Sequence, residues 1–468
     1  MDGLECSEIL LSSLGEKSPD HRIDAEYYKK EFLSIDKTLS ALPCQPLAGL
    51  CDLITDGTHY TPEYQPQGVP FLSAVNVKEN FFDLTAGYKY ISKAEHQDLV
   101  RRCRPKPGDI LLRKVGVGPR YACVIPESAP EHSIFVSLAL LRAPKISAYY
   151  LSTYINCSYG QKQLLRFNKG ISQPDLHLED IARLSVPLFG DALYESVERT
   201  VYRAQQLQIE AIARYGSAEQ LLLQQLHLDV LSLSSSNVAL KTLSSSFGQS
   251  GRLDAEYYQK KYDDLFDALA NVKTCPLEEL VYLKKSIEPG SDEYLTQGIP
   301  FVRVADLSRF GLAEPAIHLS KIPFAHMGLQ PQKDTILLSK DGSVGIAYRV
   351  EEDLEVVTSG AILHLLLKQE DFLPDYLTLV LNSPIVQMQA ERDAGGSVIQ
   401  HWKPAEIEKT LIPWLPLHQQ EQLVARVRES FSLRKQSQSL LAQARKAVEL
   451  AIEQDEQAAL SWLAAPMP

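Results

Sequence analysis

Cysteine is scarce in this chain of 468 residues, and membrane-spanning hydrophobic runs are absent. The seven cysteines are scattered, odd in number and never spaced as Cys-x-x-Cys; they occupy positions 6, 44, 51, 103, 123, 157 and 275. This pattern argues against a disulfide framework and a structural zinc site. No apolar run approaches the roughly 20 residues of a membrane span, and the acidic start Met1–Glu5 does not resemble a signal peptide. We therefore expect a cytoplasmic protein with reduced thiols.

Motifs of catalysis are also missing. The sequence has no Pro-Pro pair, and so no Asn/Asp-Pro-Pro-aromatic element of amino-methyltransferases; it has no P-loop and no His-Glu-x-x-His. The Pro-Asp pairs at 19, 174 and 374 are not followed by the acidic-x-Lys element of nucleases, and the 11 histidines are dispersed. Together these absences favour a recognition protein over an enzyme. We expect no catalytic residue, no metal site and no cofactor bound by this chain.

Positive charge is in short supply overall, but it is unevenly distributed. The net charge is −12. Residues 45–190 hold 16 Lys/Arg against 13 Asp/Glu, a balance of +3, whereas residues 276–414 hold 12 against 20, a balance of −8. Specific contact with nucleic acid requires only a local basic face. The acidity therefore lowers, without excluding, the expectation of DNA binding by the isolated chain.

One heptapeptide motif occurs twice in the chain. Residues 22–28, Arg-Ile-Asp-Ala-Glu-Tyr-Tyr, return 230 positions later as residues 252–258, Arg-Leu-Asp-Ala-Glu-Tyr-Tyr. Gly68-Val69-Pro70-Phe71 matches Gly298-Ile299-Pro300-Phe301 at the same offset, and later matches drift by a few residues, as loop insertions would cause. A collinear series of this length indicates a tandem duplication. We expect a helix over 22–42 with Asp24 as its amino-terminal cap or first-turn acid, and we expect the paired tyrosines to pack that helix against its module.

Each copy continues into a long segment with helical periodicity. Residues 191–230 lack proline, residues 417–458 lack proline and glycine, and both carry apolar side chains at spacings of three and four. We expect the two helices to pack antiparallel as a coiled-coil-like spacer. For residues 191–230 the alternative is an amphipathic helix lying on a domain. The partner-binding positions predicted on the apolar stripes are Val197, Val201, Ala204, Leu222, Val424, Val427, Phe431, Leu441 and Val448.

In their order and duplication, the motifs resemble those of the specificity subunits of type I restriction–modification systems. The residues that carry the resemblance are Asp56–Pro62 leading into Gly68–Phe71, then Pro107–Leu112, and Ile412–Leu417 with Gln419-Gln420. Module two departs from the pattern with Lys333-Asp334 where module one has Gly108-Asp109. The resemblance extends over nearly the whole chain.

The resemblance implies a mixed α/β fold with two tandem duplicated target recognition domains, separated by two long antiparallel helices and related by pseudo-two-fold symmetry. It implies a subunit without catalysis that reads a bipartite double-stranded DNA target at a spacing set by the helices. Its partners would be two modification subunits, which use S-adenosylmethionine to methylate adenine N6, and restriction subunits, which use ATP and Mg²⁺ to cleave unmethylated DNA. The expected domains are an arm and lead-in helix (1–44), recognition domain one (45–190), a central helix (191–230), a linker and lead-in helix (231–275), recognition domain two (276–414) and a C-terminal helix (415–468).

Candidate DNA contacts are polar and basic side chains beside glycine turns and strand ends. Arg and Lys suit guanine and phosphate, while Asn and Gln suit adenine. In module one the candidates are Thr58, His59, Tyr60, Arg113, Lys114, Arg120, Lys169 and Gln173. In module two they are Arg303, Ser339, Lys340, Arg349, Gln400, His401 and Lys403. Two other functions remain open: a catalytic restriction enzyme with an unrecognised site, and a scaffold or inhibitor of a defence complex that does not bind DNA.

Overall fold

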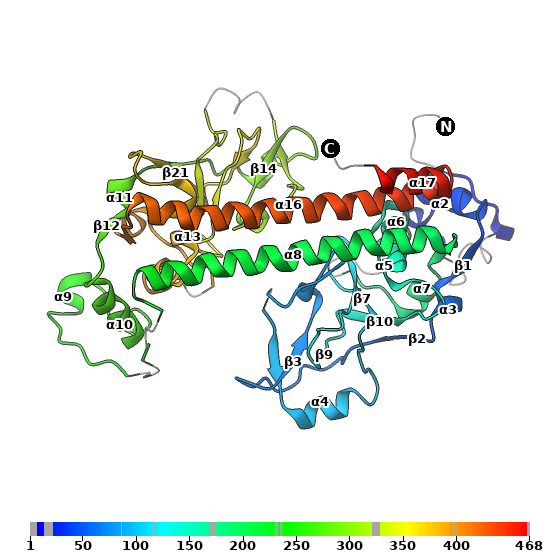
Figure 1. Cartoon of the computed structure of the whole chain (residues 1–468), viewed down its shortest axis with the longest axis horizontal. Coiled ribbons are helices and arrows are strands. Elements are labelled where there is room, and N and C mark those ends of the chain that lie inside the picture. The colour runs from blue at the N-terminus through cyan, green and yellow to red at the C-terminus, as the bar shows by residue number, and fades with distance from the viewer. Residues whose placement is uncertain are drawn as a thin grey trace. The chain divides into compact units, whose positions relative to one another are not determined.

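The structure, a computed structural model, contains two compact units (Figure 1). Unit 1 comprises residues 1–209 and 434–468, and unit 2 comprises residues 210–433. The structure describes residues 7–13, 22–85, 87–116, 118–168, 174–229, 233–234, 236, 238–320, 328–396 and 398–465. Within these ranges no helix is long and apolar enough to cross a membrane.

Unit 1 is built on a four-stranded antiparallel sheet with the strand order β2-β10-β7-β8. A three-stranded sheet (β6-β3-β9), a hairpin (β4-β5) and the pair β1-β11 accompany it. The strands are β1 Cys44–Pro46, β2 Leu53–Asp56, β3 Val69–Leu72, β4 Val77–Lys78, β5 Phe81–Phe82, β6 Lys89–Ile91, β7 Ile110–Arg113, β8 Ala122–Val124, β9 Ser133–Ile134, β10 Leu138–Arg142 and β11 Ser185–Pro187. The helices are η1 Leu11–Ser13, η2 Ala25–Tyr28, α2 Lys30–Ser40, α3 Leu47–Leu50, η3 Ala74–Asn76, α4 Lys93–Leu99, α5 Ala148–Asn156, α6 Ser158–Phe167, α7 Leu178–Ala182 and α17 Glu456–Ala464.

Unit 2 repeats this architecture in the same strand order: β13-β21-β18-β19, β17-β14-β20, β15-β16 and β12-β22. The strands are β12 Thr274–Pro276, β13 Val281–Lys285, β14 Ile299–Val302, β15 Leu307–Ser308, β16 Gly311–Leu312, β17 His318–Leu319, β18 Ile336–Ser339, β19 Ala347–Arg349, β20 Val357–Thr358, β21 Ile362–Leu367 and β22 Leu411–Pro413. The helices are α9 Phe247–Ser250, α10 Lys260–Leu269, α11 Leu277–Leu280, η4 Ser291–Glu293, η5 Val304–Asp306, α13 Pro374–Asn382, α14 Pro384–Asp393 and α15 Pro404–Ile407.

Two long helices complete the chain, and each contributes residues to both units. Helix α8 spans Asp191–Gln225 and helix α16 spans Leu417–Glu453. Helix α8 is five residues shorter than the predicted segment 191–230, because His227 adopts a left-handed conformation (φ 56°) that ends the helix. The amide of Leu228 then donates to the carbonyl of Leu223 at 2.8 Å. Helix α16 ends before the predicted residue 458, because the Asp455 side chain caps the separate helix α17.

The duplicated Gly-Val/Ile-Pro-Phe element opens the same strand in each unit, and its glycine has a structural reason. Gly68 and Gly298 have φ values of 152° and 143°, a region that side chains rarely adopt. A Cβ atom would lie 2.2 Å from the Ile91 carbonyl oxygen at Gly68, and 2.1 Å from the Leu319 carbonyl oxygen at Gly298. The backbone of the neighbouring strand therefore leaves room only for glycine.

The repeated heptapeptide forms the same cluster twice. In unit 1 Asp24 caps η2, as predicted, and Tyr27 lies between two guanidinium groups, with Arg22 at 4.7 Å and Arg166 at 4.1 Å from the ring centre. In unit 2 the ring of Tyr257 has Arg252 at 4.5 Å and Arg392 at 5.0 Å. The predicted helix over 22–42 is in fact two helices, η2 and α2. Tyr27 and Tyr28 are buried and Tyr257 and Tyr258 are half-buried, so the prediction that the tyrosines pack the lead-in segment is confirmed.

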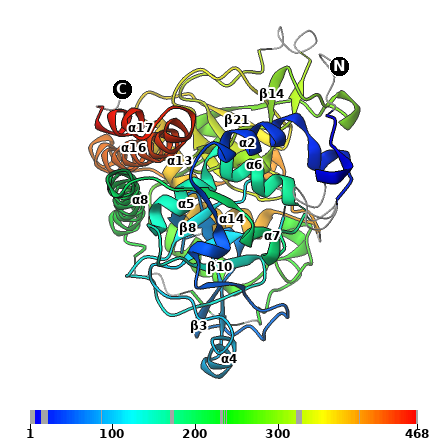
Figure 2. The ribbon, with the colours of Figure 1, turned by 90° about the vertical axis from the view of Figure 1, so that its right-hand side faces the viewer.

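Within each unit, α8 and α16 run antiparallel and share a buried seam. In unit 1, where Figures 1 and 2 show the two helices side by side, the Ser437 hydroxyl donates to the Ala204 carbonyl at 2.7 Å. In unit 2 the Ser430 hydroxyl donates to the Ala211 carbonyl at 2.7 Å. Ala204 of α8 thus corresponds to Ser430 of α16, and Ala211 corresponds to Ser437, an offset of 226 residues in each case. The predicted mixed α/β fold with two similar units and two long helices is therefore confirmed; the pseudo-two-fold relation and the exact domain bounds stay predictions.

The predicted partner-binding side chains belong to this seam. Seven of them are buried, namely Val197, Val201, Ala204, Leu222, Val424, Val427 and Val448, while Phe431 and Leu441 are partly buried against the same cores. All except Ala204 belong to, or pack against, the two cores that include residues of both long helices; their role in binding a partner stays a prediction. Because the chain itself covers them, a separate subunit would have to contact other faces of the helices.

Candidate nucleic-acid interface

A polar loop follows β2 in unit 1 and begins at a buried carboxylate. Asp56 ends the strand with its side chain 4% exposed, and Gly57 follows where a Cβ atom would lie 2.1 Å from the Ile134 carbonyl oxygen. The loop then presents His59, 63% exposed in its side chain, and Tyr60, whose hydroxyl donates to Glu95 at 2.6 Å. The predicted residue Thr58 is buried and bridges to Phe135 in the neighbouring segment. His59 and Tyr60 are therefore the accessible part of this loop.

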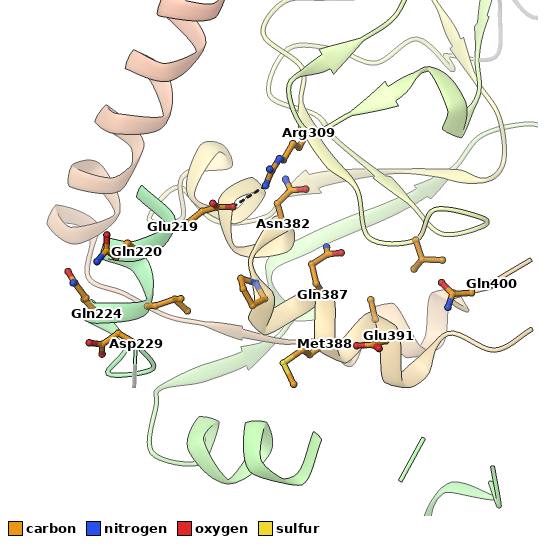
Figure 3. Close-up of a pocket in the computed structure, with 14 residues that line it drawn as sticks. Glu219, Gln220, Gln224, Asp229, Arg309, Asn382, Gln387, Met388, Glu391 and Gln400 are labelled. Carbon is orange, nitrogen blue, oxygen red and sulfur yellow. Dashed lines mark hydrogen bonds and ion pairs between the residues drawn. The ribbon is translucent and has the colours of Figure 1, made fainter. Parts of the chain in front are cut away.

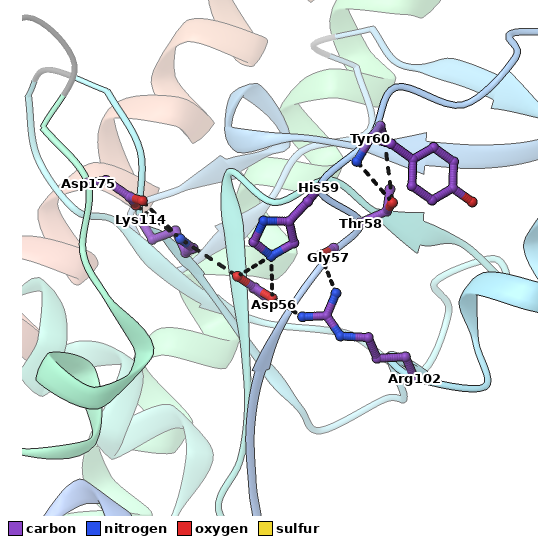
Figure 4. A network of polar contacts seen from close by, with 8 residues as sticks. All are labelled: Asp56, Gly57, Thr58, His59, Tyr60, Arg102, Lys114 and Asp175. Carbon is purple, nitrogen blue, oxygen red and sulfur yellow. Dashed lines mark hydrogen bonds and ion pairs between the residues drawn. The ribbon is translucent and has the colours of Figure 1, made fainter.

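Three basic side chains converge on the Asp56 carboxylate (Figure 4). Arg102 lies 2.6 Å away, His59 3.2 Å and the ammonium group of Lys114 3.7 Å. Lys114 is only 5% exposed and also pairs with Asp175 at 3.0 Å. A buried ammonium group depends on such paired carboxylates, because water no longer solvates it. The structure therefore gives Lys114 an internal role, and its predicted contact with DNA does not fit its burial.

A basic run that is not among the predicted DNA contacts lies beside this loop. Residues 101–106 read Arg-Arg-Cys-Arg-Pro-Lys and follow α4. Arg102 and Cys103 of this run line a hollow of about 300 Å³ together with residues 57–60. The side chains of Arg101 and Arg102 are 80% and 56% exposed, and Arg104 and Lys106 are exposed as well. Among the ion pairs of the described chain, none involves Arg104 or Lys106. Four exposed cations within six residues of sequence offer positive charge to a phosphate backbone.

Arg113 and Arg120, also predicted to contact DNA, are held inside unit 1. Arg113 is half-buried and donates to the Val77 carbonyl at 2.6 Å. Arg120 is 4% exposed and donates to the side-chain oxygen of Asn168 at 2.9 Å and to the Pro174 carbonyl at 3.0 Å. Burial lowers the pKa of both guanidinium groups. These contacts position the loops around β7 and β8 and leave little of either side chain for DNA. Lys169 and Gln173 lie outside the described residues.

The predicted contacts of unit 2 divide into buried and accessible groups. Ser339 is fully buried and donates to the Ser343 carbonyl, and Arg349 pairs with Asp334 at 2.7 Å and with Asp375 at 3.3 Å. Arg303 is half-buried next to η5. The structure brings Lys340 and His401 together on the carboxylate of Asp341. Gln400, His401 and Lys403 are exposed on one loop, and the last two have side-chain exposures of 59% and 75%.

The basic run has no basic counterpart in unit 2. The strand registers of β7 and β18 align Ile110 with Ile336, so Arg104 and Lys106 correspond to Gln330 and Gln332. Gly108 then corresponds to Asp334, and both adopt a left-handed backbone, with φ of 84° and 68°. This corrects the alignment of Gly108-Asp109 with Lys333-Asp334 that the sequence suggested. Loss of this cationic run contributes to the acidic balance of the second module.

No model of a known protein family matches the chain, and no curated protein matches its sequence. Solved structures similar to it include the S subunit of a type I restriction-modification system from M. genitalium, with 12% identity, 91% of this chain and 96% of that chain covered, and a TM-score of 0.37. Another comes from a study of complex assembly and conformational transition in the type I R-M system, with 14% identity, coverage of 90% and 98%, and a TM-score of 0.29. The HsdS subunit from Thermoanaerobacter tengcongensis shows 15% identity, coverage of 90% and 97%, and a TM-score of 0.28. The first and third of these structures are S or HsdS subunits, and the second belongs to a type I R-M system.

Proposed function

We propose that this chain recognises a two-part double-stranded DNA sequence, with one unit reading each half, and that it catalyses no bond chemistry itself. The observation that carries the proposal is the duplication of one fold, strand order included, within a single chain. Two linked binding units suit a partner that offers two sites, because the first contact raises the effective concentration of the second.

The exposed side chains of each unit support DNA as that partner. In unit 1 the basic run 101–106 supplies charge for phosphates beside His59 and Tyr60. In unit 2 the exposed loop residues Gln400, His401 and Lys403 supply an amide, an imidazole and an ammonium group. Arginine and lysine suit guanine and phosphate, and glutamine suits adenine. We assign positioning on the backbone mainly to unit 1, because unit 2 is the acidic one.

Modification and restriction subunits are the partners that the sequence motifs imply. In this proposal the modification subunits bind S-adenosylmethionine and methylate adenine N6, and the restriction subunits use ATP and Mg²⁺ to cleave unmethylated DNA. An exposed face of α8 is available for docking: Tyr202 and Ile209 lie seven residues apart and expose 53% and 49% of their surfaces. Residues at this spacing share one face of a helix.

The test uses the purified chain with and without its modification subunits, on a DNA library of random sequence. With S-adenosylmethionine present, the assembled complex should methylate adenine only within a bipartite sequence. The chain alone, given Mg²⁺, ATP and S-adenosylmethionine, should neither methylate nor cleave. Product formed by the chain alone would identify an enzyme, and an assembled complex whose DNA affinity does not depend on this chain would identify a scaffold or inhibitor.

A further inference from the structure

Each unit has a hairpin turn that contacts the long helices, and the ion pair that the turn forms has reversed charges in the two units. In unit 1 the turn between β4 and β5 consists of Glu79 and Asn80, named here tip 1. In unit 2 the turn between β15 and β16 consists of Arg309 and Phe310, named tip 2. The two tips occupy equivalent positions at the 230-residue offset of the repeat. Their residue types nonetheless differ in charge and in polarity.

Tip 1 makes polar contacts with its helices. Glu79 forms an ion pair with Arg445 of α16 at 2.7 Å. The Asn80 backbone carbonyl accepts from the Gln205 side chain of α8 at 2.7 Å, and its fully buried side chain accepts from the Ser152 hydroxyl at 2.7 Å. Seat 1 consists of the two contacting helix residues, Gln205 and Arg445, together with Leu441, which lies one turn before Arg445 on α16.

Tip 2 makes the reversed ion pair and aromatic contacts. Arg309 pairs with Glu219 of α8 at 3.1 Å, as Figure 3 shows. The ring of Phe310 lies 5.1 Å from that of Tyr215 and 6.0 Å from that of Phe431, measured between ring centres. Phe431, Tyr215 and Glu219 form seat 2, and they are the counterparts of Gln205, Leu441 and Arg445 at the 226-residue offset of the helices.

We propose that the tips and seats form a matching set that docks each recognition domain on its own helix segments and disfavours the other seat. A duplicated chain needs such discrimination, because tandem repeats misassemble and exchange domains through equivalent surfaces. Such docking acts during assembly of the chain and does not depend on DNA binding.

Docking on the wrong seat is disfavoured mainly because mismatched residues repel each other, and less because the native ion pairs are lost. A half-exposed ion pair stabilises little, but tip 1 on seat 2 would place Glu79 against Glu219. Burial raises the pKa of both carboxyl groups, and two carboxylates side by side in this place would repel each other with little screening by water. The Asn80 carbonyl would also face Phe431 in place of the Gln205 amide from which it accepts in unit 1. Conversely, Arg309 would face Arg445. Specificity of this kind depends on built-in repulsion.

The experiment transplants tip 2 into unit 1 of the full chain. The variant Glu79→Arg/Asn80→Phe should lose protection of the peptide containing residues 77–82, with hydrogen exchange accelerated about tenfold or more as the docked hairpin opens. Adding Gln205→Phe, Leu441→Tyr and Arg445→Glu builds seat 2 beneath the new tip and should restore protection. The simpler pair Glu79→Arg and Arg445→Glu should show the same loss singly and recovery together.

A matched control reverses the exposed ion pair between Lys162 and Glu31, which lie 3.5 Å apart in the same unit. Its single and double reversals should leave exchange of residues 77–82 unchanged. Unchanged protection in the tip variant would overturn the proposal, because the tips would then be interchangeable. Failure of the seat substitutions to recover protection, whether or not the five-fold variant folds, would overturn it equally.

Discussion

Removing two cations from the basic run should weaken DNA binding in a way that salt reveals. Arg104→Gln/Lys106→Gln converts these positions to the residues that unit 2 carries there, Gln330 and Gln332, so the fold should tolerate the change. Neither side chain takes part in an ion pair of the described residues, and each exposed cation is free to neutralise one phosphate. Each phosphate contact contributes about 0.9 to the slope of log affinity against log salt. The variant should therefore lose about 1.8 units of slope.

The loss of affinity follows from the same slope. If both proteins bind equally at 1 M salt, the double variant should bind about 60-fold more weakly at 0.1 M. Affinity is measured by fluorescence anisotropy across a salt series, for the chain assembled with its modification subunits. Lys37→Gln/Lys162→Gln removes two other cations of unit 1, of which Lys37 is exposed and Lys162 half-buried, and serves as the control of equal charge. An unchanged slope in the first variant, or an equal loss in the control, would refute a local contact at residues 101–106.

Three further predictions follow from backbone, burial and helix length. Gly68→Ala should lower the free energy of unfolding by more than about 3 kcal/mol in urea titrations, because its Cβ meets the Ile91 carbonyl; Gly108→Ala, with φ of 84° and no atom within 4 Å, should cost only about 1–2 kcal/mol. Burial lowers the pKa of His364 from 6.5 to about 4, so the neutral side chain contributes stability that is complete above pH 6.5 and lost as the pH falls towards 4. The loss should reach up to about 3 kcal/mol and should vanish in His364→Gln, measured as unfolding free energy against pH. Inserting one heptad after Ala211 and another after Ser437 adds about 10 Å to each helix and should widen the gap between methylated half-sites by about three base pairs; an unchanged gap would show that the helices do not set it.

Much of the fold was predictable because the repeated motifs and the heptad stripes can be recognised from residues close together in the sequence. The heptapeptides at 22–28 and 252–258 and the Gly-Val/Ile-Pro-Phe elements fall at equivalent places in the two units. Helix ends were less accurate, because the end of α8 depends on a histidine, His227, in a left-handed conformation that sequence rarely indicates.

The candidate site was harder to predict, because burial and pairing depend on distant residues. Lys114 sits beside a glycine turn as expected of a contact residue, yet Asp56 and Asp175, each about 60 residues away, bury and pair it. The basic run 101–106 is visible in the sequence. The signal that could have identified it is that Arg104 and Lys106 correspond to Gln330 and Gln332 in the second copy. The ion pair between Glu79 and Arg445, 366 residues apart, could not be read from local patterns.

The most direct test of the central claim is a genome-wide map of N6-methyladenine in cells that carry this chain with its modification subunit. We predict methylation at one bipartite sequence, with two defined half-sites at a fixed separation. His59→Ala/Tyr60→Ala, on the exposed loop of unit 1, should change the bases required in one half-site and leave the other half-site and the separation intact. Methylation at a continuous sequence, or a variant map altered equally in both half-sites, would contradict independent reading of DNA by the two units.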